Sequence, residues 1–313
     1  MDGITVAVTG ASGFLGSAVA EVLGSRGAQV RALVRSEGIP GSFRGDLTEN
    51  GWPAEAFEGA DVLVHCAAAL GGPLHHQRRL NRDGTELVAR QAARAGVPRL
   101  VHISSVAVYG YRGTYFPETL PLNPSSQAYS TTKAEAEVAA RREFPGVTII
   151  RPGGIFGPGA RFWSANVVKR AKRRLAFNIG RGDGTLPVVF VDDVADLVAT
   201  TSTHPAAIGE SFNCCLDPAP TWREYQRAYG NLVGSGGWIP LPVSLAKLSA
   251  AVVSKLGSEG STRSVIDELL RYALRQKQFP MDKARSLLGW EPRFDLEGAV
   301  AATAPWLRAQ GLI

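Results

Sequence analysis

Short apolar runs alternate with helical patterns through the first half of the chain. Continuous apolar and β-branched runs, typical of strands buried on both faces, occur at Ile4–Thr9, Ala28–Val34, Asp61–Ala68, Arg99–Gly110 and from Gly146 onward. Between them, apolar residues recur at helical spacing over Phe14–Gly24, Thr85–Gly96 and from about Ala128. This alternation predicts an α/β fold with a doubly wound parallel sheet, in which ligands bind outside the carboxyl ends of the strands.

A glycine-rich turn joins the first strand to the first helix. Its sequence, Gly10-Ala11-Ser12-Gly13-Phe14-Leu15-Gly16, brings unpaired N–H groups and the positive end of the helix dipole together, which suits a phosphate. A tight turn that only packs the helix is the alternative, but the flanking strand and helix favour a dinucleotide site. We expect cofactor contacts from Gly10, Ser12, Gly13, Phe14, Leu15 and Gly16.

The end of the second strand indicates which dinucleotide binds. A carboxylate there would accept hydrogen bonds from the adenosine ribose and repel a 2′-phosphate, but the chain has Val34 followed by Arg35. NADP(H) is therefore favoured and NAD is the alternative; Arg35 could instead be a solvated strand-end cation. In the next segment, Asp46 could accept from the adenine amino group or cap a turn, with Leu47 beside it.

Tyr129 and Lys133 stand four residues apart in a predicted helix and so share one face. A nearby ammonium lowers the pKa of a phenol, which makes tyrosine a usable general acid or base. A serine from a neighbouring strand end, Ser104 or Ser105, could hydrogen-bond the oxygen of a substrate while hydride moves to or from its carbon. The alternative is a packed ring beside a solvated lysine.

The alternation fades beyond about His204, where proline and glycine interrupt irregular segments. We expect a Rossmann-type dinucleotide-binding domain over residues 1–159, to which residues 188–203 return. Residues 160–187 and 204–313 would form a smaller C-terminal α+β substrate lobe. Within it, Leu241–Gly257 predicts an apolar helix packed on its own domain; a pocket wall and a membrane contact are the alternatives.

Composition narrows the choice of partner. The 313 residues carry a net charge of +6, yet only 20% are charged and no long block has one sign, which favours small anionic ligands over nucleic acid. The basic cluster Lys169–Arg174 either holds a phosphate or forms a solvated helix face. Three cysteines without metal-ligand spacing predict a reducing cytoplasm and no metal site, and no apolar run approaches the roughly 18 residues of a membrane span.

Eight motifs occur in the order typical of the extended short-chain dehydrogenase/reductase family, the NAD-dependent epimerase/dehydratase superfamily, and the chain resembles this family over nearly its whole length. The motifs are "TGASGFLG", "LVHCAA", "NRDGT", "SSVAVYG", "YSTTK", "RPGGIFGPG", "VFVDDVA" and "FPMDKARSLLGWEPR". The resemblance implies that Ser105 is the catalytic serine, that Tyr129 transfers the proton, and that Lys133 also contacts the nicotinamide ribose. It further implies cofactor contacts from Ala67, Ala68, Asn81, Pro152 and Gly153.

The resemblance also bears on the reaction and on assembly. Val106-Ala107 replaces the Asp-Glu pair of sugar-nucleotide dehydratases, and Leu186-Pro187-Val188 replaces an Arg-Asp pair typical of sugar-nucleotide enzymes. The chain is more similar to the hydroxysteroid-dehydrogenase and dihydroflavonol-reductase-like branch, which implies an NADP(H)-dependent reductase of a small-molecule carbonyl. A sugar-nucleotide 4-epimerase or 4-ketoreductase and a non-catalytic NADP-sensing protein are the alternatives. A homodimer through the helices at about 84–95 and 128–142 is also implied.

Overall fold

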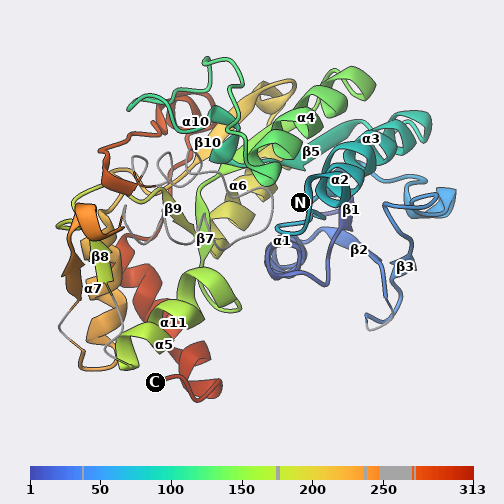
Figure 1. The fold of residues 1–313 in the computed structure, drawn as a ribbon. Coiled ribbons are helices and arrows are strands. Elements are labelled where there is room, and N and C mark those ends of the chain that lie inside the picture. The colour runs from blue at the N-terminus through green and yellow to red at the C-terminus, as the bar shows by residue number, and fades with distance from the viewer. Residues whose placement is uncertain (37–38, 174–176, 236–237, 247–269, 271–272) are drawn as a thin grey trace.

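A computed structural model of the protein describes residues 1–36, 39–173, 177–235, 238–246, 270 and 273–313 (Figure 1). Its centre is a seven-stranded sheet in the order β10-β6-β5-β4-β1-β2-β3, and every neighbouring pair in it is parallel. The strands are β1 Thr5–Thr9, β2 Gln29–Val34, β3 Phe43–Arg44, β4 Val62–His65, β5 Arg99–Ile103, β6 Thr148–Pro152 and β10 Ser211–Cys214. The predicted doubly wound parallel sheet is confirmed.

Helices cover both faces of this sheet. One core, with Leu63 and Leu100 from the strands, packs under α3 and α4; the other, with Val8 and Val101, packs under α1, α6 and α10. These helices, with the short α2 beside α4, span α1 Phe14–Ser25, α2 Leu74–Arg78, α3 Gly84–Arg94, α4 Ala128–Glu143, α6 Val191–Thr203 and α10 Asp282–Leu288. Because successive strand side chains alternate between two covered faces, the central strands are mainly apolar on both faces.

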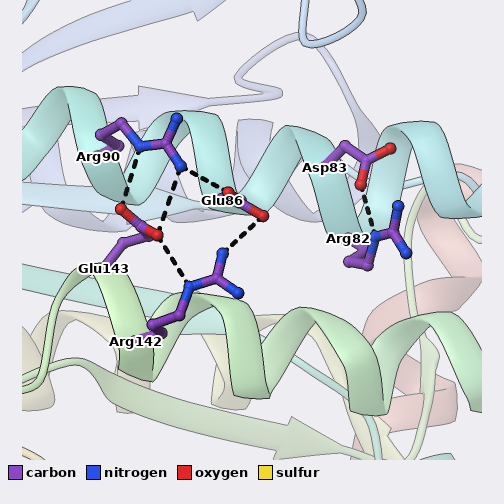
Figure 2. Close-up of polar contacts among 6 residues, drawn as sticks. All are labelled: Arg82, Asp83, Glu86, Arg90, Arg142 and Glu143. Atoms are coloured by element: carbon purple, nitrogen blue, oxygen red, sulfur yellow. Dashed lines mark hydrogen bonds and ion pairs between the residues drawn. The ribbon is translucent and has the colours of Figure 1, made fainter.

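Charged side chains join α3 to α4 on their solvent side (Figure 2). Arg90 contacts Glu86 at 2.5 Å and Glu143 at 3.1 Å, and Arg142 contacts the same two carboxylates at 2.8 and 3.0 Å. All four side chains are partly exposed, so each pair contributes little by itself, but the closed ring of pairs fixes how one helix lies against the other. The family resemblance implies a homodimer that forms through these two helices. The dimer stays a prediction.

The second lobe has its own core. Phe156, Tyr225 and Tyr229 pack there edge to face, with Leu296 and Leu307 from the last helix. Its elements are β7 Gly154–Phe156, α5 Asn166–Lys172, β8 Phe177–Ile179, β9 Val188–Phe190, α7 Trp222–Asn231, β11 Ile239–Leu241 and α11 Leu296–Ala309. In Figure 1, α5, α7 and α11 lie together, away from α3 and α4.

The observed boundary between the two parts differs from the expected one. β10 pairs with β6 at the edge of the main sheet, and Ala284 and Leu288 of α10 pack in the core beneath α6, although residues 204–313 were expected in the second lobe. Strand β6 would otherwise be an open edge, and the apolar β10 covers it. Most of the predicted helix Leu241–Gly257 lies outside the described residues; Leu241 itself ends β11 and residues 243–246 are helical.

Candidate active site

One large cavity opens at the carboxyl ends of the strands, where the fold class places ligands. Its volume is about 1590 Å³, more than the roughly 300–1,000 Å³ of a drug-sized pocket, so a dinucleotide and a substrate fit together. All but one of the residues expected to contact a cofactor or substrate line it. They are Gly10, Ser12, Gly13, Phe14, Leu15, Gly16, Arg35, Asp46, Leu47, Ala67, Ala68, Ser105, Tyr129, Lys133, Pro152 and Gly153.

The glycine turn is shaped by two close backbone approaches. A Cβ on Gly16 would stand 2.1 Å from the Gly10 carbonyl oxygen, and Gly10 itself has φ +68° and touches Ala67. Gly13 is the N-cap of α1, so no capping side chain competes for the first N–H groups of the helix, and the first turn contains no acidic residue. These N–H groups are therefore available to a phosphate, which suits the pyrophosphate of a dinucleotide.

Arg35 stands at the far end of the same cavity, after β2. Its side chain is exposed, and in the described part of the chain its guanidinium makes no hydrogen bond or ion pair. Val34, by contrast, is 2% exposed in the core and does not line the cavity. Arg35 is therefore the charged side chain from this strand end that lines the cavity, where it can meet an adenosine ribose or its phosphate.

Asp46 is largely engaged in a local turn. Its Oδ1 accepts hydrogen bonds from the backbone N–H and the hydroxyl of Thr48, each at 2.7 Å. These bonds lower the pKa of Asp46, and Arg35 and Arg79 add smaller contributions of the same sign. The turn-capping alternative thus accounts for these contacts. Asp46 also lines the cavity.

Asn81 is the expected cofactor residue that does not line the cavity. Its side chain is 1% exposed, accepts from Ala69 N at 2.7 Å, and donates to Ala69 O and to Thr132 Oγ1, each at 3.0 Å. Asn81 therefore holds the loop after β4, which includes Ala67 and Ala68, in place against α4. Any effect it has on a cofactor passes through that loop.

The two serines after β5 face different surroundings. Ser104 is buried, and its hydroxyl donates to Glu137 Oε1 at 2.5 Å. Ser105 is the N-cap of a 3-10 turn over Val106–Tyr109; its Oγ accepts from Ala107 N at 3.2 Å, and the side chain is near enough to the Tyr129 phenol to lower its pKa. Ser105, not Ser104, thus has its hydroxyl beside the tyrosine.

The electrostatics of Tyr129 differ from the expectation. Burial raises the pKa of Tyr129, and the hydrogen bond with Ser105 opposes this rise only in part. Lys133 is not among the groups that shift it, and its Nζ donates to the Ile103 carbonyl at the end of β5, at 2.6 Å. Tyr129 is also the second residue of α4, where the helix dipole favours an anion.

Lys133 is 2% exposed, and burial lowers its pKa to about 8. Glu137, one turn further along α4, opposes this shift, and Cys66 does so more weakly. Glu137 itself accepts a bidentate ion pair from Arg151 of β6, at 2.9 and 2.7 Å. Arg151 also donates to the Tyr109 hydroxyl at 2.9 Å, and Tyr109 donates to Asn213 of β10 at 2.8 Å. Lys133 therefore belongs to a buried polar network that links α4 to strands β5, β6 and β10.

The part of the cavity that sequence reasoning missed is largely aromatic and apolar. Trp163 packs against Gly154, since a Cβ there would meet its ring at 2.7 Å, and its ring centroid is 6.1 Å from that of Trp222. The Tyr225 hydroxyl donates to the Trp163 carbonyl and so anchors this segment. Other aromatic and apolar lining residues are Leu70, Val106, Tyr111, Phe162 and Leu186, and Gln127 and Arg161 are polar members of the same wall. The pair "FW" right after the "GPGAR" turn was the available signal.

In the described residues, no cluster of three or more His, Cys, Asp or Glu side chains is placed to hold a metal ion. A search of the same residues for a helix long and apolar enough to cross a membrane finds none.

The sheet and the glycine turn together define a doubly wound dinucleotide-binding fold, and Ser105, Tyr129 and Lys133 line its cavity. The chain belongs to the NAD dependent epimerase/dehydratase family, whose model matches residues 6–215. Its class is that of NAD(P)-dependent oxidoreductases and epimerases.

Relatives of nearly equal length have different activities. The chain is 28% identical to a ceramide reductase of Caulobacter vibrioides, over 98% of this chain and 95% of that protein. It is 24% identical to a UDP-glucose 4-epimerase of Vibrio cholerae, over 96% and 94%. The crystal structure of gox2253 matches with a TM-score of 0.81 and 27% identity, over 99% of both chains. Membership of the family therefore does not select the reaction.

Gly16→Ala should weaken dinucleotide binding at least about tenfold, because the added methyl group would force the turn away from the Gly10 carbonyl. Gly24→Ala, in the same helix with nothing within 4 Å of an added Cβ, is the control and should retain binding with unchanged or slightly higher stability. Fluorescence titration of both variants with NADPH and NADH measures this. Equal affinities for Gly16→Ala and wild type would show that the turn does not hold the cofactor.

Glu137→Gln should move the basic limb of the pH profile of kcat/KM to lower pH. Removing the carboxylate takes away an interaction that raises the pKa of Lys133, so the ammonium loses its proton below a pH of about 8. Glu135→Gln, on the same helix but paired outward with Arg78, is the control and should keep the wild-type profile. An unshifted profile in Glu137→Gln with lower stability alone would make Glu137 purely structural.

Proposed function

We propose that the protein is an NADP(H)-dependent oxidoreductase that interconverts a carbonyl and a secondary alcohol. The observation that carries this proposal is the grouping of the Ser105 hydroxyl, the Tyr129 phenol and the buried Lys133 beside a cavity that also has a free helix N-terminus. A dinucleotide sensor would need the helix N-terminus but no proton-transfer group.

In the direction of reduction, Ser105 would donate a hydrogen bond to the carbonyl oxygen and Tyr129 would transfer its proton to that oxygen. The bound dinucleotide supplies the hydride that reaches the carbonyl carbon, so that the product is the alcohol. Tyr129 then regains a proton from solvent. The raised pKa of Tyr129 keeps the phenol protonated before the reaction, as a general acid requires. In the direction of oxidation, the same proton returns to Tyr129.

The choice of NADP(H) over NAD is supported by Arg35. A guanidinium that is exposed, unpaired among the described residues and on the cavity wall is suited to a 2′-phosphate.

The substrate is proposed to be apolar. The wall contributed by Trp163, Leu186 and Trp222, together with Val106 and Tyr111, offers large hydrophobic surface next to the reacting groups. A sugar nucleotide would need more hydrogen-bonding partners and cations than this wall supplies.

The second candidate is a sugar-nucleotide 4-epimerase or 4-ketoreductase. Arg161 on the cavity wall and the similarity to the Vibrio cholerae epimerase favour it. An epimerase keeps its NAD and regenerates it, so purified protein would carry tightly bound NAD that is not consumed. A reductase would consume NADPH in a screen of ketones, aldehydes, steroids and 4-keto sugar nucleotides.

Tyr129→Phe should lower turnover of the ketone found in that screen by at least roughly a hundredfold, because the general acid is lost. NADPH affinity should be nearly unchanged. Tyr115→Phe, with a 52% exposed ring outside the cavity, is the control for loss of a hydroxyl and should behave as wild type. Normal turnover in Tyr129→Phe would remove this residue from catalysis, and unchanged cellular activity with intact NADPH binding would favour the sensor.

Arg35→Ala should lower NADPH affinity at least about tenfold, since a charge-assisted contact contributes on the order of 1.5–3 kcal/mol. NADH affinity should barely move, and Arg35→Asp should reverse the preference because the carboxylate accepts from the ribose and repels the phosphate. Arg31→Ala is the control, because this arginine of the same strand donates instead to the Glu58 carbonyl at 2.5 Å. A wild-type preference for NADH in binding titrations would overturn the choice of cofactor.

A further inference from the structure

The segment that runs from the cavity along α5 carries charge of one sign. Between Ala160 and Gly182 the sequence has seven lysines and arginines and no aspartate or glutamate. Lys169, Arg170 and Lys172 lie on α5 and Arg173 is its C-cap; all four side chains are exposed. Among the described residues, none of these four makes an ion pair or a side-chain hydrogen bond. Arg90 of α3 and Arg142 of α4, in contrast, are paired with carboxylates.

The cations point away from the body of the lobe. Val168 and Ala171 are the buried residues of α5, and Val168 belongs to the lobe core with Tyr225 and Tyr229. Because these two residues define the inner face of the helix, the lysines and arginines between and after them occupy the outer face.

Exposed apolar side chains stand at both ends of this basic helix. Phe162, just before α5, is 64% exposed and also lines the cavity. Beyond the other end, Phe177 of β8 is 51% exposed and its register partner Ile239 of β11 is 60% exposed. The seven residues of α5 span only about 10 Å, so Phe162 before the helix and Phe177 four residues after its C-cap lie close to the cations along the chain.

We propose that this α5 surface, formed by Phe162, Lys169, Arg170, Lys172, Arg173, Phe177 and Ile239, binds the headgroup region of an anionic lipid bilayer. The cations would contact lipid phosphates, and the apolar side chains would enter the boundary of the acyl chains. An aliphatic Ile239 beside Phe177 suits hydrocarbon better than the stacked bases of a nucleic acid, which favour aromatic platforms. The contact is peripheral and needs no spanning helix.

Docking in this way would bring the rim of the cavity to the bilayer, because Phe162 belongs to both surfaces. An apolar carbonyl compound dissolved in the membrane could then enter the cavity without crossing water. This consequence rests on the proposed function, whereas the binding of the bilayer does not.

Flotation with lipid vesicles tests the proposal. Wild-type protein should bind vesicles of phosphatidylcholine mixed with phosphatidylglycerol and should not bind vesicles of phosphatidylcholine alone. Added salt should release the bound protein from the mixed vesicles. Arg170→Gln/Arg173→Gln should lower the partition coefficient at least about tenfold, since each cation near an anionic surface strengthens binding several-fold. Arg82→Gln/Arg94→Gln removes the same charge beside and on α3, well apart from α5 in Figure 1, and should change it little.

Ile239→Ser separates the apolar contribution: it should retain binding at low salt and lose it at moderate salt sooner than wild type does. Unchanged melting temperature and NADPH affinity in each variant would show that the fold and the cofactor site are intact.

Absence of binding to anionic vesicles, or equal losses in the two arginine pairs, would overturn the proposal. Displacement from vesicles by polyuridylate at lower concentration than by free phosphatidylglycerol would assign the surface to nucleic acid instead. Vesicle binding needs no turnover, so an inactive protein that floats would overturn only the proposed reaction.

Discussion

The ion pair between Glu137 of α4 and Arg151 of β6 is the contact on which the candidate site depends. Both side chains are almost fully buried, and the guanidinium meets both carboxylate oxygens. A buried charge that loses its partner costs about 3–5 kcal/mol, so α4 and β6 cannot slide past one another without a large loss of stability. Ser104 and Tyr109 attach the same pair to the end of β5 and to β10. Tyr129 and Lys133, on the first two turns of α4, thereby take fixed positions over the strand ends.

The same burial sets the acid–base character of the site. It raises the pKa of Tyr129 and lowers the pKa of Lys133 to about 8, so both groups are driven toward their neutral forms. Beneath Lys133, the stacked rings of His65 and His102 are also kept neutral, with the pKa of His65 lowered to about 3. They therefore add no positive charge that would expel the ammonium. Glu137 supports that ammonium, which makes one carboxylate serve both the geometry and the charge of the site.

Sequence reasoning recovered the features that depend on local spacing. The glycine turn, the helical pair Tyr129 and Lys133, and the buried strands each follow from periodicity or from a close backbone approach within a few residues. The direction of the Lys133 side chain could not be predicted, because it is set by a carbonyl 30 residues away. Likewise, Asn81 is turned inward by Ala69 and Thr132, and β10 joins the sheet because β6 offers an edge. Contacts between distant segments decide such details, and a single sequence does not show them.

Two places outside the sheet bear on the cofactor and the substrate of the proposed reaction. One is the end of β2, where Arg35 lines the cavity while its neighbour Val34 is buried in the core. The other is the wall from the second lobe, where Trp163 lies against Gly154 and is anchored through Tyr225. Because the wall belongs to the lobe core and the proton-transfer groups belong to α4 and β5, the lobe can change the substrate without disturbing Tyr129 or Lys133. An apolar wall beside these groups would suit the proposed reductase of hydrophobic carbonyl compounds, and a different wall on the same fold would suit a sugar-nucleotide epimerase.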